Sequence, residues 1–279
     1  MQRLPSFGHN CSGSEHVTTV ALPEGFGKMN AHTKSCLAQK LSHYAELDEA
    51  SLESIARFER EEKDFAKNDE VYQEGDQNIH LYVVKKGWLY SYADLKDGRR
   101  QIVEIHHPGD IVGFPDIAFT ERTTVLRAAE DVRLCPFPKK DLDEVFKRAP
   151  QLAALLFALA VRNQVIMIDF LRAIGRMSAR ERIAYLLLDL QARLRITNTT
   201  MTTTFRLPLN QTEISDVLGL TNVYVSRSFT ALEKDGLIRR SNGSVEILEE
   251  DRMKRICDFS DRHTKLDTSW FPDGTPVEA

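Results

Sequence analysis

A cluster of polar side chains lies in the last third of the chain, and its members are Asn222, Tyr224, Ser226 and Arg227. The guanidinium of an arginine matches the two acceptors on the edge of a guanine, and asparagine pairs in a similar way with adenine. Hydroxyl groups donate to phosphate oxygens. We therefore expect this cluster to bind nucleic acid, with Arg227 on a guanine. A phosphate contact, or a salt bridge to Glu233 or Asp216, is the alternative for Arg227.

The segment around these residues has the pattern of two short helices joined by a tight turn. Asn210 is placed to cap the first helix, with Glu213 completing a capping box. Gly219 suits the left-handed backbone that ends this helix, and Thr221 suits the cap of the second. One helix then braces the other, which offers its first turns to the major groove of DNA. The pattern predicts a helix-turn-helix.

The predicted helix-turn-helix supplies a set of expected DNA contacts, which are Gln211, Thr212, Thr221, Asn222, Val223, Tyr224, Ser226, Arg227, Arg239 and Arg240. The residues that open the first helix are placed to donate to phosphate. Asn222 either reads adenine or assists the cap, and Val223 can pack on a thymine methyl. The run from Ile238 to Ile247 alternates around Asn242-Gly243, which predicts a hairpin that serves as a wing.

The composition of the whole chain is that of an ordinary globular protein. It has 279 residues, 42% hydrophobic and 28% charged, with a net charge of −4. This length favours two domains, and the small net charge gives no general attraction to nucleic acid. Residues 175–248 nevertheless hold more cations than acids. The scattered cysteines predict no metal site. The apolar run Leu152–Val161 is too short to span a bilayer. We therefore expect a cytoplasmic protein that does not associate with a membrane.

The first half of the chain is rich in short strands, expected at Ile79–Val84, Gly87–Ala93, Arg100–Ile105 and Thr124–Leu134. Glycine-containing turns separate them, and Asp-Gly between apolar runs is typical of hairpins. Such a region forms a small barrel or sandwich, and we expect a β-barrel. A short helix is expected before it, near Asp48–Glu62.

A long helix is expected at about Gln151–Ile174, after a shorter one near Asp141–Arg148. Its heptad series predicts a dimer seam made of Leu152, Leu156, Leu159, Asn163, Ile166 and Phe170. A single asparagine at an a position can fix the register of two helices. The alternative is a core helix packed within one chain, in which Asn163 makes a local hydrogen bond.

The remaining segments complete an α+β organisation with a hinge in the middle. Ser178 and Glu181 form a second capping box, which opens a helix to about Leu194 and places the hinge at Gly175–Met177. The tail from Phe259 is expected to be poorly ordered. The expected parts are a flexible extension (1–45), a β-barrel sensor domain (46–149), a dimerisation helix (150–174), a winged helix-turn-helix (175–250) and a tail (251–279).

This order of parts resembles the CRP/FNR family of bacterial transcription regulators over about Leu47–Leu248. The residues that carry the likeness are Glu74-Gly75-Asp76, Gly87, Pro108-Gly109-Asp110-Ile111-Val112-Gly113, Leu218-Gly219-Leu220-Thr221, Val225-Ser226-Arg227, Leu232 and Asp235-Gly236-Leu237-Ile238. The resemblance implies a homodimer that reads a palindromic promoter site of two half-sites about one helical turn apart. It also implies contact with RNA polymerase if the protein is an activator.

The resemblance breaks down at the residues that would hold an effector. Relatives that bind cyclic AMP pair Gly-Glu with a later Arg-Ser/Thr, whereas this chain has Gly113-Phe114-Pro115-Asp116 and then Arg122-Thr123. Arg122 and Thr123 are the candidate effector residues, but the cassette is half matched, which disfavours cyclic AMP. Cys11 and Cys36 lack the neighbours that an iron–sulfur cluster needs. Haem binding remains an alternative, with His80, His106 and His107 of the sensor domain as the candidate ligands.

The sequence contains no pattern that is typical of an enzyme. It lacks a P-loop, a His-Glu-x-x-His motif and a Gly-x-Ser-x-Gly motif. We therefore expect a DNA-binding regulator and not a catalyst. The alternative is a regulatory protein that binds a cyclic nucleotide or haem and uses its helix-turn-helix to bind protein.

Overall fold

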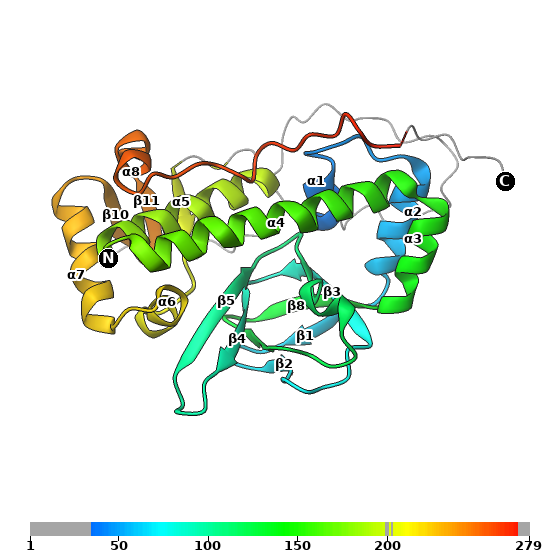
Figure 1. Cartoon of the computed structure of the whole chain (residues 1–279), viewed down its shortest axis with the longest axis horizontal. Helices are drawn as coiled ribbons and strands as arrows, with labels where there is room; N and C mark the ends of the chain where they lie inside the picture. Colours follow the sequence, from blue (N-terminus) through cyan, green and yellow to red (C-terminus); the bar gives the residue numbers. More distant parts are fainter. Residues whose placement is uncertain (1–34, 199–200, 202, 273–279) are drawn as a thin grey trace, which may run out of the picture. The chain divides into compact units, whose positions relative to one another are not determined.

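The structure is a computed structural model that describes residues 35–198, 201 and 203–272. From Ser35 onward the chain forms one compact unit. Two short helices come first, and eight strands follow them. A second group of helices and a small three-stranded sheet then complete the chain (Figure 1).

The strand-rich region is a sandwich of two four-stranded antiparallel sheets. One sheet has the order β1-β8-β3-β6, made of Lys63–Phe65, Val132–Pro138, His80–Lys86 and Ile111–Val112. The other has the order β2-β7-β4-β5, made of Glu70–Tyr72, Val125–Ala128, Leu89–Asp94 and Arg100–His106. The closed barrel expected from the sequence is therefore corrected to a jelly-roll-like sandwich.

One strand expected from the sequence is two strands in the structure. Thr124–Leu134 contains two strands, β7 and β8, and these lie in different sheets. The polar residues Glu130 and Asp131 lie between them and mark the break. Single-turn 3-10 helices lie at Pro115–Ala118 and Lys139–Asp141.

The segment that precedes the sandwich is helical, which corrects part of the expected flexible extension. Helix α1 spans Cys36–Leu41, is capped by Ser35, and buries Leu37 and Leu41 almost completely. Helix α2 spans Glu49–Phe58 with Asp48 as its cap, as expected. The apolar residues of both helices belong to a core that they share with β3 and β8. The rest of the expected extension, residues 1–34, lies outside the described residues.

Helix α3 (Leu142–Arg148) leads into the long helix α4 (Pro150–Arg176), which ends at the predicted hinge. Met177 is extended, and Ser178 and Glu181 form the expected capping box at the start of α5 (Ala179–Thr197). Helix α4 is long and apolar enough to cross a membrane by length and composition alone. However, one of its faces is packed in this chain's core, and its Asp169 is paired with Arg262 at 3.0 Å.

The C-terminal part contains the predicted winged helix-turn-helix. It comprises α6 (Gln211–Leu218), α7 (Asn222–Lys234), the hairpin β10–β11 (Ile238–Ser241 and Ser244–Ile247) and α8 (Glu250–Ile256). Asn242 and Gly243 both have positive φ, as the predicted hairpin turn requires. Strand β9 (Thr204–Arg206) adds a third strand beside β11.

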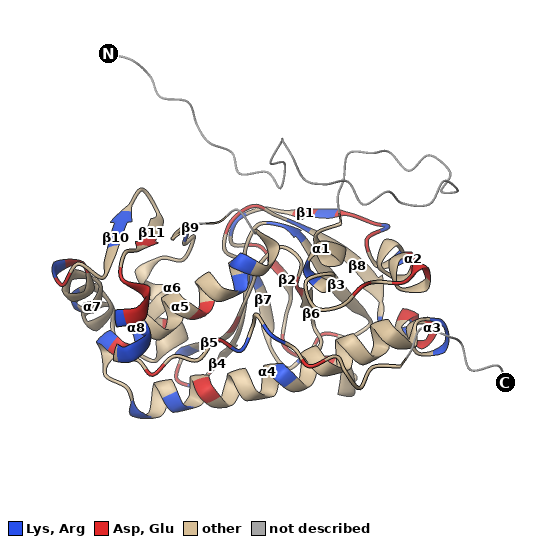
Figure 2. Cartoon of the chain, turned by 90° about the horizontal axis from the view of Figure 1, so that it is seen from above, with Lys and Arg blue, Asp and Glu red and all other residues tan. Residues whose placement is uncertain are grey.

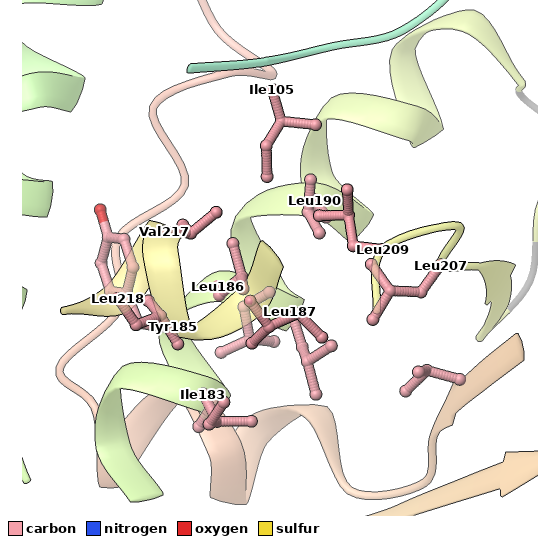
Figure 3. Close-up of a cluster of buried hydrophobic side chains, with 14 of the residues drawn as sticks. Ile105, Ile183, Tyr185, Leu186, Leu187, Leu190, Leu207, Leu209, Val217 and Leu218 are labelled. Carbon is pink, nitrogen blue, oxygen red and sulfur yellow. The ribbon is translucent and has the colours of Figure 1, made fainter. Parts of the chain in front are cut away.

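The helix-turn-helix and the sandwich share one buried apolar core. Figure 3 shows Ile105 of β5 together with Leu190 of α5 and Val217 of α6. The amide of Gln101 in β5 also donates to the carbonyl of Val217 at 2.9 Å. The β4–β5 hairpin is therefore in direct contact with the bracing helix of the DNA-binding part.

The tail is ordered beyond α8, which corrects the expectation of a poorly ordered segment from Phe259. His263 is buried, and its Nε2 atom lies 2.7 Å from Asp189 Oδ1 of α5. Leu266 and Phe271 pack against the core around α1 and α2. These contacts hold the segment through Phe271, and the last residues, 273–279, lie outside the described residues.

Candidate DNA-binding interface

The two helices of the interface are fixed by their end groups. The side chain of Asn210 accepts from the amides of Thr212 and Glu213, and the carboxylate of Glu213 accepts from the amide of Asn210. Gly219 ends α6 with φ of +61°. Thr221 caps α7 by accepting from the amide of Tyr224 at 3.4 Å. The predicted caps are thus confirmed, and the hydroxyl of Thr221 is already engaged at the helix start.

One face of α7 packs inward and the other is free of neighbouring elements. Val225, Phe229 and Leu232 are almost fully buried in the core. The opposite face carries Val223 and Tyr224, both more than half exposed, together with the exposed Asn222 and Arg227. Ser226 lies at the edge of this face and is half-buried. The predicted base-reading residues therefore share one side of the helix.

The same face includes two residues that the sequence reasoning missed. Thr230 and Lys234 are exposed and follow Val223 and Arg227 at helical spacing. Steps of four, three and four residues starting from Val223 would have found both. The outward stripe of α7, defined here as Val223, Arg227, Thr230 and Lys234, is thus longer than the predicted cluster.

Arg227 makes no hydrogen bond or ion pair within the described part of the chain. The expected alternative of a salt bridge to Glu233 does not occur, because Glu233 is paired with Arg240 at 2.7 Å. Asn222 donates to the hydroxyl of Thr212 at 3.2 Å, so it ties the start of α7 to the start of α6. An arginine that stays unpaired and exposed keeps all its donors available for a ligand.

The two wing arginines differ from Arg227 because each has a carboxylate partner. Arg239 pairs with Glu246 across the hairpin at 2.8 Å. Arg240 pairs with Glu233 and lies over the ring of Phe229 at 4.5 Å. In Figure 2 the ribbon is blue, the colour of Lys and Arg, at β10 and at parts of α8. These partners hold the wing cations in place but also offset part of their charge.

The predicted dimer seam on α4 is buried in its own chain at its N-terminal end only. Leu152 and Leu156 are buried in this chain's own core, and Leu159 packs against the same core. Phe170 lies against Tyr185 of α5. Ile166 is half-buried, and Asn163 is exposed, with no side-chain hydrogen bond among the described residues. Leu152 and Leu156 therefore pack within their own chain, whereas the seam through Asn163 and Ile166 stays a prediction.

A second heptad series lies on the outward face of α4. Its members follow the predicted seam residues five positions later, and they are Phe157, Val161, Gln164, Ile168, Leu171 and Gly175. Four of these residues are large and apolar, with exposed fractions of 63% for Phe157, 42% for Val161, 65% for Ile168 and 69% for Leu171. We name this set the outward stripe of α4. An exposed apolar stripe with heptad spacing is typical of a helix that pairs with another.

The candidate effector residues Arg122 and Thr123 are turned toward an acid of their own chain. Asp116 is 2% exposed and lies 3.6 Å from Nη1 of Arg122, which is itself 3% exposed. The backbone amide and the hydroxyl of Thr123 both donate to Asp116. The guanidinium also stacks on Tyr72 and donates to the carbonyl of His80. Asp116 would therefore compete with an anionic ligand for these two residues, although Nη1 of Arg122 has no hydrogen-bond partner in the described part of the chain.

The histidines of the sensor domain are also engaged within the chain. His106 is buried and lies 2.8 Å from the hydroxyl of Ser91. His107 is fully buried, and burial lowers its pKa to about 3, which keeps the ring neutral. His80 is exposed and separate from the other two. The rings of His106 and His107 are thus buried within the described part of the chain, whereas His80 lines an open surface pocket together with Asn78 and Ile117.

A buried group of charges connects α1, the sandwich and α5 next to these histidines. Asp110 follows β5 and pairs with Lys40 of α1 and, at 3.1 Å, with Arg193 of α5. Burial alone would raise the pKa of Asp110, but the nearby cations hold this pKa well below its usual range. Arg193 also donates to the carbonyl of Ile105. The charges therefore hold the sensor domain and α5 together.

Comparison with known proteins agrees with this architecture. The family described as "Cyclic nucleotide-binding domain" matches residues 62–149, and "Crp-like helix-turn-helix domain" matches residues 181–256. The nitrogen fixation regulation protein FixK of Bradyrhizobium diazoefficiens is 32% identical over 82% of this chain and 95% of its own length. The transcriptional activator protein Anr of Pseudomonas aeruginosa is 28% identical over 85% of this chain and 94% of its own.

A solved structure shows the same fold with matching order of parts. The structure of FixK2 from Bradyrhizobium japonicum superposes with a TM-score of 0.64 at 28% identity, covering 70% of this chain and 96% of that chain. The sandwich, the long helix and the helix-turn-helix are thus each accounted for by known relatives. The chain belongs to the CRP/FNR family of DNA-binding transcription regulators.

Proposed function

We propose that this regulator reads the major groove with the outward stripe of α7. Arg227 is the residue that pairs with a guanine, because it is exposed and its donors are unused. Val223 packs on a thymine methyl one turn earlier, and Thr230 follows one turn later. Asn222, Tyr224 and Ser226 border this stripe and contact the flanking bases or phosphates. The single observation that carries the proposal is that Arg227 is exposed on this stripe and has no partner among the described residues.

The phosphate contacts come from the residues around this helix. Gln211 and Thr212 open α6, where the positive end of the helix dipole favours an anion and both side chains are placed to donate to phosphate. Thr221 caps the start of α7 and contacts phosphate at that helix end. Arg239 and Arg240 are held by Glu246 and Glu233, and they contact the phosphate backbone from the wing. These contacts position the protein and carry no base preference.

Two copies assemble through the outward stripe of α4. Its apolar side chains are exposed in a single chain, and pairing with a second copy removes them from water. A two-fold axis between two α4 helices presents the α7 helices to two half-sites of opposite orientation. The bound site is therefore a palindrome.

The chain acts in the cytoplasm as a regulator and not as an enzyme. Relatives carry the names nitrogen fixation regulation protein and transcriptional activator protein, so we extend to this chain an activator's contact with RNA polymerase. Asp116 forms an ion pair with Arg122 and accepts from Thr123, so we expect the sensor domain to work without a cyclic nucleotide phosphate at these residues.

The substitution Arg227→Ala tests the proposal. We expect the affinity for a specific promoter site to fall by about 1–3 kcal/mol per lost contact, while the affinity for random DNA changes little. The measurement is fluorescence anisotropy with labelled duplexes over a range of salt concentrations. Arg252→Ala is the matched control, because Arg252 is also exposed and unpaired among the described residues but lies on α8. An equal loss on specific and random DNA would show that Arg227 contacts only phosphate.

A further inference from the structure

The chain continues past the end of the helix-turn-helix family match at residue 256. We define the C-terminal strap as residues 258–271. Figure 1 shows it leaving α8 and passing along α4 and α5 toward α1. The direction of the strap is opposite to that of α4, because Asp258 lies near Arg172 while Trp270 lies near Phe157.

Three anchors hold the strap beside α4. Phe259 packs edge-on against Tyr185 of α5 with ring centres 5.3 Å apart. Arg262 donates to Asp169 of α4 at 3.0 Å. The buried ring of His263 meets Asp189 of α5, as described above. Each anchor joins the strap to a different turn of the two helices.

The carbonyl of His263 is a fourth point of attachment, shared by two donors. It accepts from the hydroxyl of Tyr44 at 2.8 Å and from Nη1 of Arg162 at 3.1 Å. Arg162 also donates to the Tyr44 hydroxyl at 2.7 Å. The segment after α1, helix α4 and the strap therefore meet at this position, which fixes the path of the residues that follow.

The strap ends on the outward stripe of α4. Phe271 packs into the core around α1 and α2, and this places Trp270 next to it with ring centres 4.8 Å apart. The ring of Trp270 meets Phe157 edge-on at 6.4 Å. Both side chains stay exposed, by 52% for Trp270 and 63% for Phe157. The Trp270–Phe157 pair is thus about half exposed to solvent at one end of the outward stripe of α4.

We propose that a second copy of this chain covers the Trp270–Phe157 pair, so that the strap forms part of the dimer interface. This inference rests on the proposed pairing of α4 helices and extends that interface beyond α4. Three observations support it: Trp270 adjoins the outward stripe, the anchors hold it there in the single chain, and its ring is only half covered. Aromatic residues of this kind, held rigidly at an interface, contribute strongly to binding.

The fluorescence of Trp270 tests the proposal directly. The chain contains two tryptophans, and Trp88 is buried in the core, so its surroundings do not depend on dimerisation. We expect the emission of the full-length protein to shift to shorter wavelength as concentration rises through the dimer dissociation constant, because Trp270 loses contact with water. The shift should disappear in Trp270→Phe, which leaves only Trp88.

The dimer dissociation constant gives a second, independent measurement. Analytical ultracentrifugation of Trp270→Ala should show a dissociation constant raised by about tenfold. Phe119→Ala is the matched control, because Phe119 is 55% exposed and lies on the sandwich side of the molecule, and it should leave the constant unchanged. Circular dichroism of each variant confirms that the chain is folded.

The outcomes separate this inference from the proposed function. A dimer that forms with constant Trp270 emission, and with an unchanged constant in Trp270→Ala, overturns the role of the strap and leaves the α4 pairing intact. A protein that stays monomeric at every concentration overturns the pairing and the strap's role together.

Discussion

Replacement of Ile168 by alanine should weaken the dimer without unfolding the chain. Ile168 lies on the outward stripe of α4 and is 65% exposed in the single chain. Complete burial of an isoleucine side chain contributes about 1.5–3 kcal/mol, so about 1–2 kcal/mol is still available from the exposed part. A two-fold interface contains the residue twice, which gives about 2–4 kcal/mol. This corresponds to a dissociation constant raised by about 30-fold to about 700-fold.

The control for this substitution is Leu156→Ala, on the face of α4 that packs within the chain. Leu156 is 8% exposed and packs in this chain's own core. Its truncation should lower the free energy of unfolding by about 2–5 kcal/mol. Dimer dissociation, measured by analytical ultracentrifugation at a temperature where the variant is folded, should change much less. The opposite pattern, with Leu156→Ala dissociating the dimer and Ile168→Ala leaving it intact, would refute the assignment of the two faces.

Three further changes test the interior of the sensor domain. Asp116→Asn should lower the free energy of unfolding in urea by about 3 kcal/mol, since Arg122 then stays buried without a counter-charge, whereas Glu121→Gln on the exposed loop should have little effect. Gly113→Ala should cost about 1–3 kcal/mol in the same assay, because its φ is +93° and a Cβ atom would lie 2.5 Å from Nη1 of Arg122. The free energy of unfolding should fall as pH drops below about 6.5, by up to about 1.4 kcal/mol per pH unit from His107. The pKa of His107 in the folded chain, about 3, lies below its value in the unfolded chain. The unfolded chain therefore takes up the proton first. The slope should flatten in His107→Gln, and an unchanged slope would show that His107 is already protonated in the folded chain.

The sequence predicted the helix-turn-helix well because its signals are local. Asn210, Glu213 and Gly219 each act within one or two turns of α6, and all three lie where expected. The wing was found for the same reason, since Asn242 and Gly243 determine the turn between its two strands. Signals of this kind depend on neighbouring residues, which the sequence displays directly.

The faces of α4 could not be assigned from the sequence. Two heptad series run along this helix, and both contain apolar residues at the required spacing. Leu152 and Leu156 turned inward because α1, α2 and the sandwich supply a core for them. The parts of that core in α1, α2 and β3 lie more than 60 positions away, and periodicity carries no information about which element covers a face.

The same limit explains the sandwich, the sensor residues and the strap. Closing the sheets depends on pairing between distant strands, so spacing alone did not distinguish a barrel from a sandwich. Asp116 and Arg122 are near in sequence, yet their pairing became apparent only when both were found buried. The strap has no helical or strand periodicity. Its path is fixed by the contacts of Arg262 with α4 and of His263 with α5, which the sequence does not reveal.

The most direct test of the central claim is selection of the preferred site from random duplex DNA, with the wild-type protein and Arg227→Ala in parallel. We expect a palindrome with half-sites about one helical turn apart, and a guanine in each half-site whose preference disappears in Arg227→Ala. A selected pool without two-fold symmetry, or one that is identical for both proteins, would contradict this claim.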